Sequence, residues 1–344
     1  MTVNSPASGT PMVSAAAPRV AVIILTWNRV KDIVTCLESF ADVHYPNLEV
    51  VVVDNASADE TVDTVRERFA WATLIVNDDN LGYVGGNNVG IRYALARGAD
   101  YVFILNSDTK MTPTCLEELV RVMQVDPRVA IAGAKNLYMQ NPAFTWGKYG
   151  VLNWGPMLVR THGRFVRDYP ESSPKDVDWV IGNGCMMSRE ALETVGIFDE
   201  DFFQVNEDVD WCVRAREHGY RVVYVDTAAI HHQGASSADL SKPIVFSYGY
   251  FLGRNAILFA RKHANVFQWA RLLTNMALGV ALRISFFSAG AVLRAFGGQS
   301  HFVNGMLDGF TGRLRRDRIT IRMPIPTNEP PDTPIIRLLR WLGA

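Results

Sequence analysis

The chain has few of the features that mark specialised classes of protein. Its four cysteines are spread over 344 residues without any Cys-x-x-Cys spacing, which argues against a disulfide scaffold and against a cysteine-based zinc site. Lysine and arginine (34) nearly balance aspartate and glutamate (35), so the overall charge does not indicate a nucleic-acid binder. The first 18 residues lack the basic start and apolar core of an export signal, and we interpret them as a disordered tail. We therefore expect a folded protein with buried thiols in a reducing cytoplasm.

Apolar residues make up 48% of the sequence, which is enough for a large core in one main domain with an appendage. In the first half, short apolar runs typical of buried strands alternate with helical patterns. The expected strands are Val20–Leu25, Leu48–Val53, Leu74–Val76 and Tyr101–Leu105. The expected helices are Val30–Ala41, a helix opened by a capping box at Ser57 and Glu60, Asn87–Arg97, and a helix capped at Thr112 that ends at Gln124. This alternation predicts an α/β fold with a mostly parallel sheet and helices on both faces.

The alternation breaks after Gly133, and the second half is typical of a mixed region with short strands. We expect irregular structure over 146–174, a helix capped by Ser188, and a strong helix over Glu207–His218. Short strands are expected at Val222–Val225 and Ala228–Ile230. We interpret this half as a subdomain packed on the first.

Polar residues stand where the predicted strands end. Asp54 directly follows Leu48–Val53, and Asp108 follows the strand that ends at Leu105. Because the carboxyl ends of parallel strands meet at one sheet edge, both carboxylates should lie where α/β proteins bind ligands, near Thr26 and Asn28. Asp108 is a candidate for binding metal or phosphate, and Asp54 is a candidate for binding the ribose or base. The alternative for each is that it serves only to start a turn.

A cluster of glycines and amides spans Asn80–Gly90 and leads into a predicted helix. Glycines let backbone N–H groups approach phosphate closely, and a helix N-terminus adds partial positive charge. The spacing differs from the GxGxxG dinucleotide pattern. The cluster is a candidate phosphate-binding turn, with an ordinary loop as the alternative.

Carboxylates surround the predicted helix start at Glu207, where Asp208 and Asp210 follow. Acids at a helix N-terminus are favoured by the dipole, so electrostatic capping is one explanation. The neighbouring Phe203 and Trp211 predict apolar surroundings, which would raise the pKa of a carboxylate toward that of a general base.

His231 follows the last predicted strand. A neutral imidazole there could join Asp108 as a ligand of Mn²⁺ or Mg²⁺, although oxygen ligands are usual for these ions. The alternative is a histidine hydrogen-bonded in a polar loop.

Taken in order, these segments resemble an inverting glycosyltransferase of family 2 with the A-type glycosyltransferase fold, over about Val20 to Gly253. The matching segments are Thr26–Arg29, Val53–Ser57, Asn80–Asn88, Leu105–Thr109, Gly182–Gly184, Glu207–Asp208 and His231. Each is weak alone, whereas seven in the family's order are a strong signal. Within the family the chain is most similar to bacterial rhamnosyltransferase-like enzymes that build cell-surface polysaccharides.

The resemblance implies a role for each candidate residue. Those implied to bind the nucleotide sugar are Thr26, Asn28, Asp54, Asn80, Gly82, Asn87, Asn106, Gly182, Asn183 and Trp211. Asp108 and His231 would hold Mg²⁺ or Mn²⁺ against the donor diphosphate. Asp208 would be the base for the acceptor hydroxyl, with Glu207 and Trp211 shaping its pocket. The family's metal motif is often Asp-x-Asp, and Asn106 replaces its first acid, so Asp108 should be the only acidic ligand in this motif.

The C-terminal third is basic and apolar. Between Arg254 and Arg322 there are eleven Lys or Arg and two Asp, which indicates an anionic partner. The apolar segment 272–293 contains Arg283, which costs about 2.5–3.5 kcal/mol at the centre of a membrane span. We therefore favour helices lying on the anionic cytoplasmic face of a membrane over a spanning helix and over a packed or oligomeric appendage.

The expected organisation is a disordered tail (1–18), a catalytic domain (19–240), a basic helical region (241–322), and a Pro-rich linker with a short amphipathic tail (323–344). The expected reaction is metal-dependent transfer of a sugar, with rhamnose as a candidate, from a nucleoside diphosphate sugar to a glycan or polyprenyl-linked acceptor. One alternative is a sugar nucleotidyltransferase, which would need a basic Gly-rich loop directly after the first strand, where this chain has Thr26–Arg29. The other is a non-catalytic carbohydrate-binding protein on the same fold. A homo-oligomer and a peripheral location on the inner face of the cell membrane are further expectations.

Overall fold

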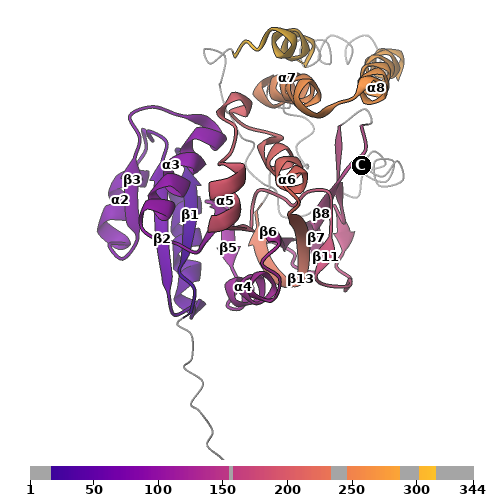
Figure 1. The fold of residues 1–344 in the computed structure, drawn as a ribbon. Coiled ribbons are helices and arrows are strands. Elements are labelled where there is room, and N and C mark those ends of the chain that lie inside the picture. The colour runs from indigo at the N-terminus through magenta and orange to yellow at the C-terminus, as the bar shows by residue number, and fades with distance from the viewer. Residues whose placement is uncertain (1–16, 155–157, 234–245, 287–301, 315–344) are drawn as a thin grey trace, which may run out of the picture.

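The computed structural model describes residues 17–154, 158–233, 246–286 and 302–314 (Figure 1). The strands are β1 Val20–Thr26, β2 Leu48–Asp54, β3 Thr73–Val76, β4 Tyr101–Asn106, β5 Thr109–Met111, β6 Val129–Tyr138, β7 Phe144–Gly147, β8 Tyr149–Leu152, β9 Val159–His162, β10 Val166–Arg167, β11 Lys175–Asp176, β12 Cys185–Ser188 and β13 Arg221–His232. The α-helices are α1 Val30–Glu38, α2 Thr61–Arg68, α3 Gly82–Ala96, α4 Cys115–Val125, α5 Arg189–Val195, α6 Glu207–Glu217, α7 Phe246–His263, α8 Val266–Phe286 and a helix over 302–311. Short 3-10 turns are η1 Ser39–Asp42 and η2 Glu200–Phe202. Most of the predicted tail (1–18) and all of the predicted linker and tail (323–344) lie outside the described residues.

One large sheet organises the chain. Its order is β10-β7-β6-β12-β4-β1-β2-β3, with β13 beside β6, and with β5 and β11 beside β13. Strands β4, β1, β2 and β3 are all parallel, which confirms the predicted first half. Strand β12 runs antiparallel between β4 and β6 and joins the two halves. The register pairs Thr26 with Asp54 and Leu25 with Asn106, so β1, β2 and β4 end at one edge as predicted.

Helices cover both faces of this sheet, and strand residues alternate between two cores. Ile23 and Val53 belong to the core that contains side chains of α3, α5 and α6. Val22 and Val52 point the other way, into the core that contains side chains of α1 and α4. Figure 1 shows α3 and α5 crossing one face of the strands. All four cysteines are buried and free, which confirms the prediction of buried thiols.

Helix α3 begins at Gly82, five residues before its predicted start at Asn87, so the glycine cluster lies inside the helix. Gly90 lets the helix approach β1 closely, because a Cβ there would overlap the Cγ2 atom of Ile23. The cluster is therefore not an ordinary loop, and close packing on the sheet explains Gly86 and Gly90, while its role toward phosphate stays a prediction.

The predicted capping box is also wrong. Helix α2 begins at Thr61, after Glu60, without a side-chain cap. Ser57 instead donates from its backbone N–H and its hydroxyl to the carboxylate of Asp54. The cap at Ser188 is confirmed, since its side chain accepts the N–H of the third residue of α5.

The C-terminal helices pack beside α6. Helix α7 contacts α6 through Lys262 and His263, which bind Asp210 of α6. Figure 1 shows α7 and α8 above α6, at one end of the sheet. Among the helices in the described ranges, none is long and apolar enough to cross a membrane. The part of the apolar segment 272–293 that follows Phe286 lies outside those ranges.

Candidate functional site

The start of α6 holds Asp208 in a fixed orientation. Its carboxylate accepts the N–H of Gly182 at 2.9 Å and the N–H of Val209 at 2.8 Å. Gly182 leaves room for this contact, since a Cβ there would lie 3.3 Å from the Asp208 carboxylate and 3.5 Å from the Tyr83 hydroxyl. Burial raises the pKa of Asp208 to about 6, although the backbone donors oppose the shift. A carboxylate with a pKa near neutrality suits general-base chemistry.

Glu207, beside Asp208, is buried and less well hydrogen-bonded. Its Oε2 atom has no hydrogen-bond partner among the described residues. Burial and then the charge of Asp208 raise the pKa of Glu207 well above its usual range. Burial and the neighbouring carboxylate thus favour the neutral form of Glu207.

Asp108 follows β4 and pairs with His232, not with the predicted His231. The Nε2 atom of His232 lies 3.2 Å from Oδ1 of Asp108, while His231 faces the other side of β13 and pairs in register with Lys110. The prediction of His231 as the partner of Asp108 is therefore wrong by one residue. Trp146 of β7 lies edge-on to the His232 ring, with centroids 4.7 Å apart.

Neighbouring groups lower the pKa of Asp108. Burial by itself would raise the pKa of Asp108, but the charge and hydrogen bond of His232 and the charge of Arg29 outweigh it and hold the pKa below its usual value. No group of three His, Cys, Asp or Glu side chains that could hold an ion occurs in the described ranges. Two protein ligands are nevertheless enough for Mg²⁺ or Mn²⁺ at a diphosphate, because phosphate oxygens and water complete such sites. Asp108 and a neutral His232 would thus fit the predicted ion.

Asn183 supports the turn that carries Asp108. Its Oδ1 atom accepts the backbone N–H of Asn106 at 2.9 Å and its Nδ2 atom donates to Oγ1 of Thr109 at 2.9 Å. Asn136 of β6 binds both the side chain and the carbonyl of Asn183. Asn183 is consequently buried and supports residues 106–109, and its contact with nucleotide stays a prediction.

Asp54, Thr26 and Asn28 meet at the ends of β1 and β2, as predicted. Asp54 is fully buried and both of its oxygens accept hydrogen bonds from Ser57, at 2.8 and 2.5 Å. Asn28 accepts the N–H of Ala58 at 2.7 Å. The Oγ1 atom of Thr26 is buried and has no partner among the described residues. The turn role left open for Asp54 is therefore present, and each of its oxygens keeps a lone pair that a further donor could use.

The amides before and inside α3 mostly organise the chain. Asn80 accepts the N–H of Gly82 at 2.9 Å, and Asn55 donates to the carbonyl of Gly82 at 2.9 Å. Asn87 is buried in the helix, donates to the carbonyl of Tyr83, and has an Oδ1 atom without a partner among the described residues. Asn80 and Gly82 thus shape the loop before α3, while Asn87 lies a helical turn inside it.

Tyr83, and not the predicted Trp211, lies near the acidic residues of the site. Trp211 is fully buried in the core and donates its indole N–H to a carbonyl of Gly196, so it packs the fold and does not line the predicted pocket. Tyr83 goes unnoticed in the sequence, yet burial and the charges of Glu207, Asp208 and Asp108 raise its pKa well above its usual value. This hydroxyl therefore lies within electrostatic reach of both acidic centres. Its only sequence signal is a position inside the glycine cluster.

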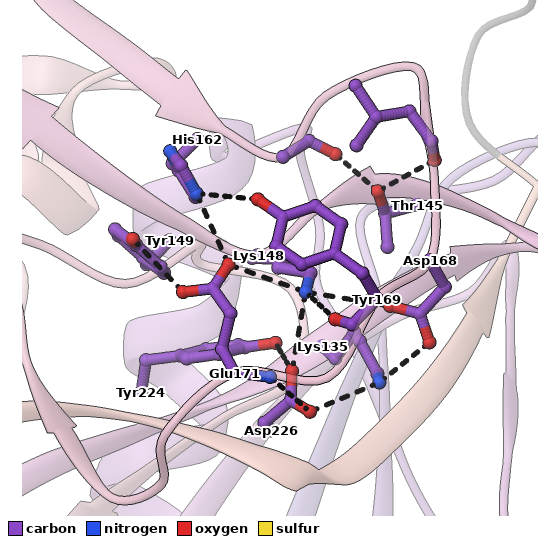
Figure 2. A network of polar contacts seen from close by, with 12 residues as sticks. Lys135, Thr145, Lys148, Tyr149, His162, Asp168, Tyr169, Glu171, Tyr224 and Asp226 are labelled. Carbon is purple, nitrogen blue, oxygen red and sulfur yellow. Dashed lines mark hydrogen bonds and ion pairs between the residues drawn. The ribbon is translucent and has the colours of Figure 1, made fainter.

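A second polar network lies in the other half of the chain, around β7, β9 and β13 (Figure 2). Its charged members include Lys135, Lys148, Lys175, Asp168, Glu171 and Asp226. Lys148 is fully buried and lies 3.4 to 3.6 Å from all three carboxylates. Because lysines here balance the carboxylates, the network holds this subdomain together and is not a cation site.

The glycine-rich helix, the strand-end acids and the acidic start of α6 can be compared with known proteins. The model of the family described as "Glycosyltransferase like family 2" matches residues 18–243. The chain belongs to this family. The prediction that it is a glycosyltransferase is thereby confirmed, in preference to a nucleotidyltransferase or a non-catalytic binding protein.

Several curated relatives of this glycosyltransferase are sugar transferases. The low-salt glycan biosynthesis hexosyltransferase Agl10 of Haloferax volcanii is 28% identical over 62% of this chain and 67% of its own length. The dTDP-rhamnosyl transferase RfbF of Shigella flexneri is 27% identical over 63% of this chain and 72% of its own length. The N-acetylglucosaminyl-diphospho-decaprenol L-rhamnosyltransferase of Mycobacterium tuberculosis is 28% identical over 55% of this chain and 68% of its own length.

Solved structures share the fold of this glycosyltransferase. The mannosyltransferase PcManGT of Pyrobaculum calidifontis, in complex with GDP-Man and Mn²⁺, has a TM-score of 0.52 at 19% identity and covers 85% of this chain and 87% of its own. GalNAc-T7 with UDP, GalNAc and Mn²⁺ has a TM-score of 0.55 at 14% identity and covers 71% of this chain and 50% of its own. These likenesses confirm the predicted A-type glycosyltransferase fold.

Proposed function

We propose that this glycosyltransferase moves a sugar from a nucleoside diphosphate sugar to a hydroxyl of a glycan or polyprenyl-linked acceptor, with inversion. The observation that carries the proposal is Asp208, a buried carboxylate with a pKa of about 6 that the N–H of Gly182 holds in place. Asp208 takes the proton of the acceptor hydroxyl while that oxygen forms its bond to the anomeric carbon. The bond from this carbon to the diphosphate breaks, and its electron pair stays on the diphosphate. Attack from the side opposite the leaving group inverts the configuration.

Asp108 and His232 would hold Mg²⁺ or Mn²⁺ at the end of β4. When bound, such an ion neutralises charge that develops on the leaving diphosphate. The Nε2 atom of His232 lies 3.2 Å from the Asp108 carboxylate, so both could reach one ion when the imidazole is neutral. Asn106 is neutral, so Asp108→Ala should reduce transfer more than Asn106→Ala does.

The relatives indicate which substrates to try first. RfbF and the mycobacterial enzyme are named as rhamnosyltransferases, and the latter name specifies a diphospho-decaprenol acceptor. We therefore propose dTDP-rhamnose as the first donor and a polyprenyl-diphosphate-linked sugar as the first acceptor. Thr26, Asn28 and Asp54 lie at the edge proposed for the base and ribose.

The test of the base combines transfer and binding measurements on Asp208→Asn. Transfer of rhamnose should fall by about 10²–10⁴-fold, the usual contribution of a positioned base. The rise in melting temperature caused by dTDP with Mn²⁺ should persist, because Asp208 is not proposed to bind nucleotide. Asp63→Asn removes an exposed acid of α2 and serves as the control. Near wild-type turnover by Asp208→Asn would exclude Asp208 as the base.

We also propose that the C-terminal helices rest on an anionic membrane. Val266 and Phe267 at the start of α8 are 77% and 84% exposed, and Leu307 and Phe310 on the helix over 302–311 are 59% and 47% exposed. Apolar side chains within a strongly basic segment suit the interface of an anionic bilayer.

Sedimentation with vesicles of anionic lipid tests this surface. The double variant Phe267→Ser with Leu307→Ser should pellet less than wild type, and neutral vesicles should pellet neither protein. If the same variant instead converts a dimer into a monomer without changing pelleting, the surface is a subunit contact and the membrane proposal is wrong.

A further inference from the structure

The turn before α6 has an unfavourable backbone. Phe203, Val205 and Asn206 have positive φ angles of 61°, 71° and 70°. Residues with a Cβ disfavour this left-handed region, and a β-branched valine does so most strongly. Such a turn persists only where surrounding contacts hold it. Since Glu207 and Asp208 follow directly, whatever holds the turn also sets where these carboxylates point.

Asn255 of α7 holds this turn from a distant part of the chain. Its fully buried amide nitrogen lies 2.9 Å from the carbonyl of Phe202, 2.6 Å from that of Gln204 and 2.7 Å from that of Val205. Its Oδ1 atom accepts from the guanidinium of Arg254 at 2.9 Å, which keeps the amide nitrogen facing the turn. One side chain thus serves three backbone carbonyls of the strained segment.

Arg254, the neighbour of Asn255, links α7 to η2. Its guanidinium donates to the carbonyl of Asp201 at 2.6 Å and to the carbonyl of Arg313 at 2.8 Å, and the residue is 1% exposed. Helix α7 is therefore joined to the turn on one side and to the end of the helix over 302–311 on the other.

The turn also contacts the opposite side of the site. The carbonyl of Phe203 accepts the N–H of Val84 at 2.9 Å, and its ring covers Gly82, where a Cβ would lie 2.6 Å from the ring. The same ring stacks on Phe251 of α7, with centroids 5.4 Å apart and planes 10° apart. A single turn therefore connects α7, the first turn of α3 with Tyr83, and α6.

Helix α6 has a separate anchor to α7. The buried Asp210 binds Lys262 at 2.5 Å and His263 at 2.9 Å, and within α6 it binds Arg214 at 2.8 Å. Loss of Asn255 should consequently release the turn without undocking α6 from α7.

We propose that Asn255 is a positioning residue for sugar transfer, whose amide holds the 202–206 turn so that Asp208 faces the acceptor hydroxyl. This role rests on the proposed function, in which Asp208 is the base. Asn255 acts through the turn and not by contact with substrate. Because Asp54 and Asp108 lie at strand ends outside this turn, the turnover rate should depend on Asn255 more than donor binding does.

Three substitutions of Asn255 test the role in the full chain, with dTDP-rhamnose as donor. Asn255→Asp keeps the side-chain size but removes the amide donor, and Asn255→Ala removes the whole contact. Each should lower kcat by about 100-fold, as expected when a catalytic group is misplaced by about 1 Å, and leave KM for the donor within about threefold. Asn255→Ser keeps one donor and should fall between wild type and Asn255→Ala.

Thr145→Val is the matched control. Thr145 of β7 is also fully buried, and its hydroxyl donates to the carbonyls of Gly163 and Val166 in the second polar network, away from the strained turn. This variant should lower the melting temperature as much as Asn255→Ala does, yet keep most of kcat. An equal loss of kcat in both variants would mean that general destabilisation explains the effect, and the positioning role would be wrong.

A rescue separates strain in the turn from loss of packing. Glycine adopts positive φ without penalty, so adding Val205→Gly to Asn255→Ala should restore kcat by about tenfold. A double variant no faster than Asn255→Ala, or an Asn255→Asp protein with wild-type kcat, would overturn the proposal. Asp208→Asn measured in parallel reports on the base itself. If this variant keeps wild-type kcat, Asp208 is not the base, and the positioning role of Asn255 is then wrong as well.

Discussion

The free energy of unfolding of Asp208→Asn should increase relative to that of wild type as the pH rises from 4 to 8. The pKa of about 6 in the folded protein lies above the ordinary value of 3.8, so the folded state holds this proton more tightly than the unfolded chain. Stability contributed by the group is therefore fully present below pH 3.8 and is lost as the pH rises through about 6. A difference of about two pKa units corresponds to about 3 kcal/mol at 1.36 kcal/mol per unit.

The structure also indicates a cost for this substitution. Asp208 accepts two backbone N–H groups, and the amide of an asparagine must turn its own N–H toward one of them, at about 1–3 kcal/mol. This cost does not change with pH. The free energy of unfolding of Asp208→Asn should therefore gain about 2–3 kcal/mol relative to wild type between pH 4 and pH 8, whatever its absolute value.

Urea unfolding followed by tryptophan fluorescence, at several pH values, measures this difference. Asp210 is the control, because it lies on the same helix and has the opposite shift. Burial would raise the pKa of Asp210, but His263, Arg214 and Lys262 outweigh it and lower the pKa to about 2. The stabilisation that ionised Asp210 contributes is present above pH 3.8 and is lost only as the pH falls through about 2. Asp210→Asn should therefore destabilise the protein at every pH from 4 to 8. Parallel pH curves for wild type and Asp208→Asn would refute the burial argument.

Further substitutions test the other contacts. In Mn²⁺ titrations of transfer, His232→Ala should raise the ion concentration needed for half-maximal rate more than His231→Ala does, and the reverse order would remove His232 from the ion site. Lys148→Met should lower the free energy of unfolding by about 3–5 kcal/mol, because it leaves buried carboxylates without their cation; a loss below about 1 kcal/mol would contradict the network. Gly90→Ala should lower the free energy of unfolding by about 1–3 kcal/mol despite the better helix propensity of alanine, because its Cβ would overlap Ile23 of β1. A more stable variant would show that β1 can shift to make room for it. Burial opposes the shift, but Lys175 and Lys148 lower the pKa of Glu171 from 4.5 to about 2, so Glu171→Gln should destabilise the protein above pH 4.5 and lose this effect as the pH falls toward 2.

Much of the site was predictable because parallel strands impose a simple geometry. Apolar runs identified β1, β2 and β4, and polar residues directly after them had to meet at one edge, which the pairing of Thr26 with Asp54 confirms. The start of α6 at Glu207 was equally predictable, since a helical pattern and the acids of its first turn are local properties of the sequence.

Other features depended on contacts between distant segments. His231 and His232 are indistinguishable in sequence, and the pairing of β13 with β5 decides which one faces Asp108. The early start of α3 depends on Phe203, which covers Gly82 from the turn before α6.

The sequence by itself determined the α/β fold and the edge where the acids gather, because these depend on local periodicity and on residues next to strand ends. The kind of enzyme followed from the resemblance of seven short segments to a known family. Only the tertiary structure decided that Asp208 is buried enough to have a pKa of about 6 and that Asn255, 47 residues away, holds the turn in front of it. Burial and hydrogen bonding at a site depend on everything packed around it, and the contact of α7 with α6 exists only in the folded chain.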